Sequence, residues 1–113
     1  MEHGHSLVIP PYVDKNNYAY WKVRMKAFLK SIDERVWNSV EYEWEKPTTP
    51  VSEWQTSQKK TTAFNRKALN VVFNVASMEE FKRISNVKVA HTAWNILQTV
   101  HEGIKIVKIN KLQ

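Results

Sequence analysis

Apolar side chains recur at three- and four-residue steps through most of this chain, and this spacing constrains its fold more than any other feature of the sequence. The clearest stripe starts just after Asn17 and lies on one side of a helix: Tyr18, Trp21, Met25, Phe28, Leu29 and Ile32. No segment alternates apolar and polar residues over the length of a strand. With 113 residues, the chain is the size of one domain. We therefore predict an all-α fold, a compact bundle of about five helices.

The stripes and the loop signals between them set the expected helix bounds, at 17–31, 33–43, 52–75, 78–84 and 88–101. Three starts carry capping residues: Asp33 is an expected N-cap, and Ser52 with Gln55 and Ser77 with Glu80 fit capping boxes. The expected core anchors all lie on the stripes: Tyr18, Trp21, Met25, Trp37, Trp54 and Trp94. Phe81 and Ile84 are the expected buried residues of the short fourth helix.

The two ends of the chain are expected to differ from the helical domain, which should span 17–103. Residues 1–16 should be extended, because Pro10 and Pro11 interrupt the apolar run Leu7–Val13. We expect this run to lie in a groove between helices, with Ile9, Pro10 and Tyr12 as its candidate contacts. Gly103 can end the fifth helix in the left-handed conformation. Residues 104–113 are then a linker or the start of a following helix.

Catalytic, metal and cofactor sites are not expected in this sequence. It has no cysteine and no phosphate-binding glycine motif, and His91 and His101 are too far apart along a helix to share a metal. The bland interpretation of both histidines is a solvent-facing or helix-end position. No apolar run is long enough to span a membrane, and no secretory signal is present. We expect a soluble, cytoplasmic protein that is not an enzyme and has no membrane partner.

The net charge of +6 permits binding to RNA but does not demand it. The candidate contacts are basic residues of the third helix and of the C-terminal end: Lys59, Lys60, Arg66, Lys67, Lys105, Lys108 and Lys111. A solvated surface is the simpler interpretation of these side chains, so we expect RNA binding by this chain to be weak.

Apolar residues that lie off the main stripes are candidates for docking of another subunit or a partner. On the third helix these are Leu69 and Phe73, which are four residues apart. On the first helix they are Tyr20, Val23 and Ala27, which form a second stripe behind the buried one. Either neighbouring helices cover these residues or another chain does.

Several of these residues also form a recognisable order of short motifs. The first half of the chain holds Ile9-Pro10-x-Tyr12, Asn17-Tyr18-x-x-Trp21, Met25, Leu29, Trp37, Pro47 and Trp54. The second half holds Ala68, Phe81, Ala90-His91-Thr92-Ala93-Trp94-x-x-Leu97 and Glu102-Gly103. In this order and spacing, the chain resembles the Gag polypeptide of copia-type LTR retrotransposons, plant elements above all.

The resemblance implies a capsid-like N-terminal lobe. Such Gag polypeptides are similar to retroviral capsid proteins, whose helical lobes associate into a shell around the element's RNA. It therefore implies a structural, self-associating domain of a Gag polyprotein, whose principal partner is a copy of itself. A domesticated Gag-like module, which binds a peptide or partner protein in a hydrophobic groove, is the alternative that the same lobe allows.

Overall fold

The computed structural model describes the backbone of residues 18–112 and the side chains of residues 18–102, and within this range the secondary structure is entirely helical. The predictions for the N-terminal segment, including Ile9, Pro10 and Tyr12, lie outside the described residues. The elements are α2 (Tyr18–Ile32), α3 (Glu34–Glu41), the 3-10 turn η1 (Val51–Glu53), α4 (Thr56–Val75), α5 (Met78–Ile84) and α6 (Ala90–Leu112). The prediction of an all-α bundle of about five helices is confirmed for this part of the chain.

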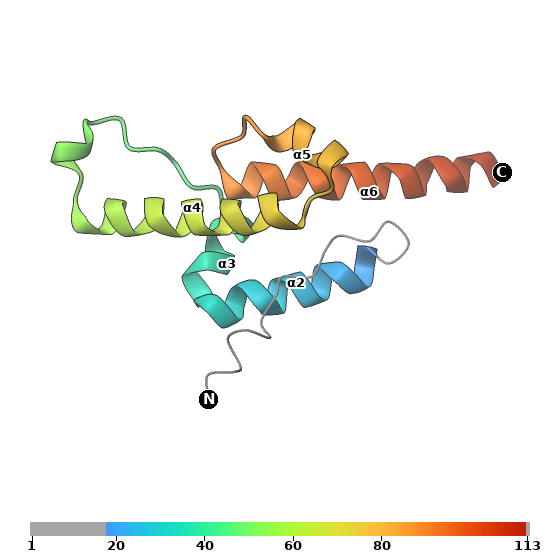
Figure 1. The fold of residues 1–113 in the computed structure, drawn as a ribbon, viewed down its shortest axis with the longest axis horizontal. Coiled ribbons are helices and arrows are strands. Elements are labelled where there is room, and N and C mark those ends of the chain that lie inside the picture. The colour runs from blue at the N-terminus through green and yellow to red at the C-terminus, as the bar shows by residue number, and fades with distance from the viewer. Residues whose placement is uncertain (1–17, 113) are drawn as a thin grey trace.

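The short helix α3 and the long helix α6 connect the bundle, because each contacts three of the four other helices. Helix α3 packs against α2, α4 and α6, while α4 and α6 also lie against each other and α5 packs on α6 (Figure 1). The last turns of α6 extend beyond the other helices (Figure 1). All helices thus meet around one centre, except for the end of α6.

Local hydrogen bonds explain where α3 and α5 begin, and both starts were predicted. At α3, the Asp33 carboxylate accepts a hydrogen bond of 2.8 Å from the backbone N–H of Arg35. At α5, the Ser77 hydroxyl accepts from the N–H of Glu80, and the Glu80 carboxylate accepts from the N–H of Ser77. In each case the cap and its partner are close neighbours in the sequence.

The predicted start of the long helix at Ser52 is wrong. Residues 51–53 form a 3-10 turn, and α4 begins only at Thr56, where Gln55 and Gln58 form the capping box. Pro50 and Trp54 both have extended backbones, and the Trp54 indole N–H donates to the carbonyl of Thr49 at 2.9 Å. Residues 51–53 form this turn and Trp54 is extended, so these residues cannot form the first turn of an α-helix that starts at Ser52.

The predicted end of the last helix at Gly103 is also wrong, since α6 continues to Leu112. Residues 104–112 are therefore neither a linker nor a separate helix. No glycine among the described residues has a positive φ. A glycine inside a helix costs only about 1 kcal/mol relative to alanine, and no proline follows to stop the helix.

The core contains a row of aromatic rings that joins three helices. Tyr18 stacks on Trp21, Trp21 stacks on Trp94 at 5.3 Å between ring centres, and Trp37 meets Trp94 edge-on at 5.6 Å. Trp21, Met25, Trp37 and Trp94 are buried as predicted, and Tyr18 is half-buried against them.

Two predicted core residues lie outside this core. Trp54 is only half-buried, because the extended segment before α4 holds its ring at the edge of the bundle. Phe81 is 39% exposed and meets Phe73 edge-on, while Ile84 provides the buried apolar contact of α5. The rings of Trp54 and Phe81 are therefore partly exposed and form part of the protein surface.

Candidate docking surfaces

The outer face of α2 carries an exposed apolar stripe, formed by Tyr20, Val23 and Ala27. The helix buries Trp21, Met25 and Leu29 on its opposite side. Tyr20 is 57% exposed and Val23 is 69% exposed, and Ala27 is exposed as well. The guanidinium of Arg24 lies 5.7 Å from the centre of the Tyr20 ring and covers part of it. The structure thus places these three predicted docking residues together on the surface.

For Leu69 and Phe73, the other candidate docking residues, the structure favours the alternative that neighbouring elements of the same chain cover them. Both side chains are half-buried and pack against the core, and Phe81 of α5 and Val87 lie on the same side of α4. Phe73 also meets the ring of Phe81 at 5.3 Å between centres. A charge at Phe73 would therefore disturb the fold as well as any interface.

The two residues nevertheless line a cleft of about 500 Å³, which we call the α4 cleft. Its walls come from the segment before α4, from α4 itself and from the segment between α5 and α6. The apolar lining residues are Trp44, Val51, Trp54, Leu69, Phe73 and Val87, and the polar ones are Lys46, Thr62, Asn65, Arg66, Ser85 and Lys88. No acidic residue is among them.

Asn65 connects the walls of this cleft. Its side chain is almost completely buried, donates to the carbonyl of Lys88 at 2.8 Å and accepts from the N–H of Ala90 at 2.8 Å. The second bond satisfies one of the free N–H groups at the start of α6. One amide on α4 therefore fixes where α6 begins. Sequence reasoning missed it, because an asparagine between apolar positions gives no sign of a partner 25 residues away.

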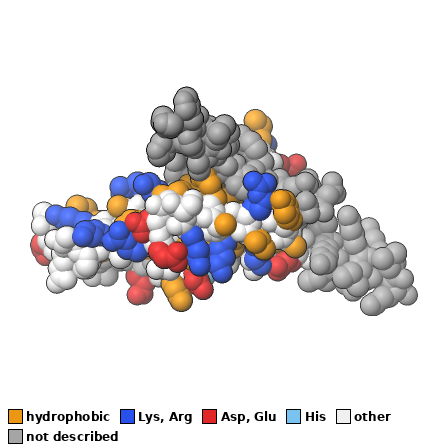
Figure 2. All heavy atoms as spheres, turned by 90° about the horizontal axis from the view of Figure 1, so that it is seen from below, with side chains coloured by type: hydrophobic (Ala, Val, Ile, Leu, Met, Phe, Trp, Pro, Cys, Tyr) orange, Lys and Arg blue, Asp and Glu red, His pale blue; other side chains and the backbone are white. Residues whose placement is uncertain are grey.

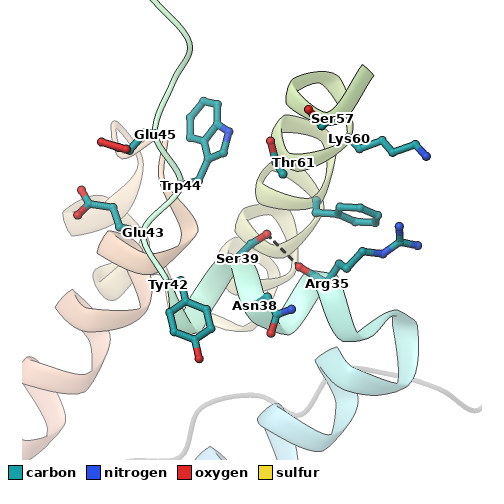
Figure 3. Close-up of a pocket in the computed structure, with 11 residues that line it drawn as sticks. Arg35, Asn38, Ser39, Tyr42, Glu43, Trp44, Glu45, Ser57, Lys60 and Thr61 are labelled. Atoms are coloured by element: carbon teal, nitrogen blue, oxygen red, sulfur yellow. Dashed lines mark hydrogen bonds between the residues drawn. The ribbon is translucent and has the colours of Figure 1, made fainter. Parts of the chain in front are cut away.

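A second cavity of about 500 Å³, the α3–α4 groove, opens between α3, α4 and residues 42–45 (Figure 3). Arg35 is already engaged there, since its guanidinium pairs with Asp33 at 3.0 Å and lies 4.5 Å from the centre of the Phe64 ring. Glu43 and Glu45 line the same groove as Lys60. The groove therefore carries both signs of charge, unlike the α4 cleft.

His101 is buried and lies inside α6, which contradicts the solvent-facing or helix-end position predicted for it. Its Nε2 atom lies 2.7 Å from Oε2 of Glu80, and both side chains are at least 95% shielded from solvent. Its ring also stacks on Tyr18 at 4.8 Å between centres. Because the other Glu80 oxygen caps α5, this carboxylate joins α5 to α6. The sequence does not indicate that Glu80 and His101 form a pair, because a capping glutamate and a helical histidine are both usually exposed.

The surroundings of Tyr18 affect its hydroxyl. Burial raises the pKa of this phenol above its ordinary value, and the nearby negative charge of Glu102 raises it further. The oxygen is enclosed and has no hydrogen-bond partner among the described residues. Tyr18 therefore acts as a neutral packing residue that covers His101.

His91 also has a structural partner. Its Nδ1 atom lies 2.7 Å from the carbonyl oxygen of Val40, and its Nε2 atom lies 3.1 Å from the Asn95 amide nitrogen. A carbonyl can only accept and an amide NH₂ can only donate, so this arrangement fits a neutral ring protonated on Nδ1. His91 is the second residue of α6, so the helix-end position predicted for it is confirmed, and it links α6 to the end of α3.

The predicted RNA contacts on α4, namely Lys59, Lys60, Arg66 and Lys67, are all exposed. Lys105, Lys108 and Lys111 lie on the last turns of α6, where side chains are outside the described residues. On the face shown in Figure 2, Lys and Arg side chains stand among acidic and apolar ones and do not form one continuous block. This distribution differs from the concentrated basic surface of a dedicated nucleic-acid-binding domain.

Among residues 18–102, no three His, Asp or Glu side chains come together as metal ligands would. In the part of the chain that the structure covers, no helix has the length and apolar character needed to cross a membrane. Neither result assigns a reaction to the chain.

Comparison with protein-family models, with curated proteins and with solved structures gave no match.

Proposed function

We propose that this chain is a structural, self-associating lobe, of the capsid type that the resemblance to copia-type Gag polypeptides implies. The observation that carries the proposal is the exposed stripe Tyr20–Val23–Ala27 on α2. A helix that buries one side in a bundle normally exposes polar residues on the other side. Here the centre of the outer face is apolar, and exposed apolar residues grouped in this way are typical of interaction surfaces.

The proposed contact is weak in isolation. The stripe is short and flanked by charged residues, so two copies bury little area when they meet. Contacts of this kind build stable shells only when many of them act together in a polyprotein. The proposed function includes the cytoplasmic location expected from the sequence, and RNA packaging belongs to the parent polyprotein.

Sedimentation over a range of protein concentrations tests the proposal. We expect the wild-type chain to be monomeric when dilute and to associate as its concentration rises toward the millimolar range. Val23→Glu places a charge in the centre of the stripe and should abolish this association without changing the melting temperature. Ala63→Glu is the matched control, because it makes the same charge change at an exposed position of α4. A wild-type chain that stays monomeric throughout, or a Val23→Glu variant that associates as the control does, would refute the proposal.

A further inference from the structure

We propose that the α4 cleft binds a peptide segment that presents one large apolar side chain between carboxylates. The site is separate from the stripe on α2, and the proposal does not rest on self-association. It rests on the shape of the cleft, on the positive charge at its rim and on the polar groups inside it that are already hydrogen-bonded within the chain.

The interior of the cleft suits an apolar side chain. At about 500 Å³ it lies within the usual range of ligand pockets, roughly 300–1,000 Å³. Trp44, Trp54 and Phe73 supply aromatic surface, and Leu69 and Val87 supply aliphatic surface. In the described part of the chain these side chains are only half-buried, and an apolar ligand side chain would remove the rest of their surface from water.

The rim of the cleft is positive. Lys46, Arg66 and Lys88 are exposed and line it, and no carboxylate lines it with them. None of these three cations has an ion pair with a carboxylate of the described residues. In the α3–α4 groove, by contrast, the chain supplies its own carboxylates, Glu43 and Glu45. The α4 cleft therefore lacks the negative charge that a ligand with flanking acidic residues would bring.

The polar groups inside the cleft favour a peptide over a single-stranded RNA. Both ends of the Asn65 amide are used by the backbone, the Thr62 hydroxyl donates to the carbonyl of Gln58, and the Trp54 indole N–H donates to Thr49. Specific RNA recognition reads base edges through free donors and acceptors. The exception is the Trp44 indole N–H, which is buried and has no hydrogen-bond partner among the described residues. An apolar side chain needs none of the committed groups, so they leave the cleft suited to it.

Fluorescence anisotropy with a labelled synthetic peptide tests the proposal. The probe carries one phenylalanine between runs of aspartate, and a second probe carries serine in place of the phenylalanine. The full chain is used when dilute, so that self-association does not contribute. We expect the phenylalanine probe to bind saturably and about tenfold more tightly than the serine probe, because only the former fills the cleft.

Variants locate the binding on the protein. The double variant Arg66→Glu/Lys88→Glu should weaken binding of the phenylalanine probe by about tenfold or more. The control Lys59→Glu/Lys67→Glu reverses two exposed charges of α4 that do not line the cleft and should change binding by less than about twofold. Melting temperatures of both variants show whether they fold alike. If either double variant is unfolded, the single variants Lys88→Glu and Lys59→Glu replace the pair.

Three outcomes would overturn the proposal: equal binding of both probes, equal loss in both sets of variants, or no binding at all. A labelled oligouridine that binds the wild-type chain more tightly than the phenylalanine probe, and that loses affinity in the Arg66→Glu/Lys88→Glu variant, would assign the cleft to RNA instead. Because Val23 lies outside the cleft, Val23→Glu should bind the probe as wild type does. The result for the cleft is thus independent of the result for the α2 stripe.

Discussion

At the scale of single residues, Glu80 and His101 form a buried polar contact that joins α5 to α6. Each side chain is at most 5% exposed, and Nε2 and Oε2 have no other polar partner in the described part of the chain. A buried pair of this kind adds little net stability. Removing one partner is costly, however, because the other polar side chain is then buried with no group to interact with. The pair is therefore important for keeping α5 on α6.

The first prediction concerns this pair. His101→Leu should lower the free energy of unfolding by about 3–5 kcal/mol, because Glu80 is left buried without its partner. Adding Glu80→Gln should restore part of that loss, since the amide carries no charge while its oxygen still caps α5. Urea denaturation of the wild type, both single variants and the double variant measures the coupling. A double variant whose loss equals the sum of the single losses would show that the two side chains act independently.

The second prediction concerns Asn65. Asn65→Ala should cost about 2–4 kcal/mol, since it leaves the carbonyl of Lys88 and the N–H of Ala90 without partners in a buried place. Asn70→Ala is the control, because Asn70 is exposed on the same helix and should cost less than about 0.5 kcal/mol. Chemical denaturation compares the two variants. Similar midpoints for both would mean that the amide does not position α6.

At the scale of elements, the start of α3 makes stability depend on pH in acid. The pKa of Asp33 is lowered from 3.8 to about 2, first by the side-chain hydrogen bonds from Arg35 and then by the backbone N–H of the same residue. A carboxylate whose pKa is lower in the folded state contributes stability above its ordinary pKa, and this contribution is lost as pH falls through the folded value. The relevant window therefore runs from about pH 4 down to about pH 2.

The third prediction follows from this window. Asp33→Asn keeps an acceptor for the helix N-terminus but cannot titrate, so it should flatten the fall in urea midpoint between about pH 4 and pH 2. Above pH 5 the variant should be somewhat less stable than wild type, because the charged bonds to Arg35 are gone. Glu45→Gln, at an exposed position, controls for the loss of one carboxylate. The same acid slope in wild type and Asp33→Asn would contradict the assignment.

The elements also show which features the sequence could predict. The starts of α3 and α5 were predictable, because Asp33 and Ser77 bond to residues two or three positions away. The start of α4 was not, because the sequence shows the usual capping pattern at Ser52–Gln55, whereas the structure caps the helix with Gln55 and Gln58, and glutamine is not a preferred N-cap residue.

Of the two candidate surfaces, one could be predicted from the sequence and the other could not. The stripe on α2 could be predicted, since residues opposite Trp21 and Met25 on one helix must face outward unless another element covers them. The α4 cleft could not, because Trp44, Asn65 and Val87 come together only after α4 and α6 have packed. Local periodicity contains no information on such distant partners.

At the scale of the whole molecule, α6 has a packed part and a projecting part. Among the side chains of α6 that the structure describes, residues 90–102, the buried ones are Ala90, Ala93, Trp94, Leu97 and His101. The remaining turns extend away from the other helices (Figure 1). A helix end whose backbone projects from the other helices should contribute little, because most helical stability in proteins comes from packing of a buried face. The stability of the bundle should therefore reside in residues up to 102.

The last prediction tests this division. A chain that ends at Gly103 should keep its helical bundle and lose less than about 1 kcal/mol of unfolding free energy, because it retains every buried contact described for α6. Trp94→Ala in the full chain is the contrasting variant: it removes a ring that contacts both Trp21 and Trp37 and should cost about 3–5 kcal/mol. Urea denaturation, followed by far-ultraviolet circular dichroism, measures both. If the shortened chain loses as much stability as Trp94→Ala does, the last turns of α6 belong to the folded core, and the boundary of the stable lobe lies beyond Gly103.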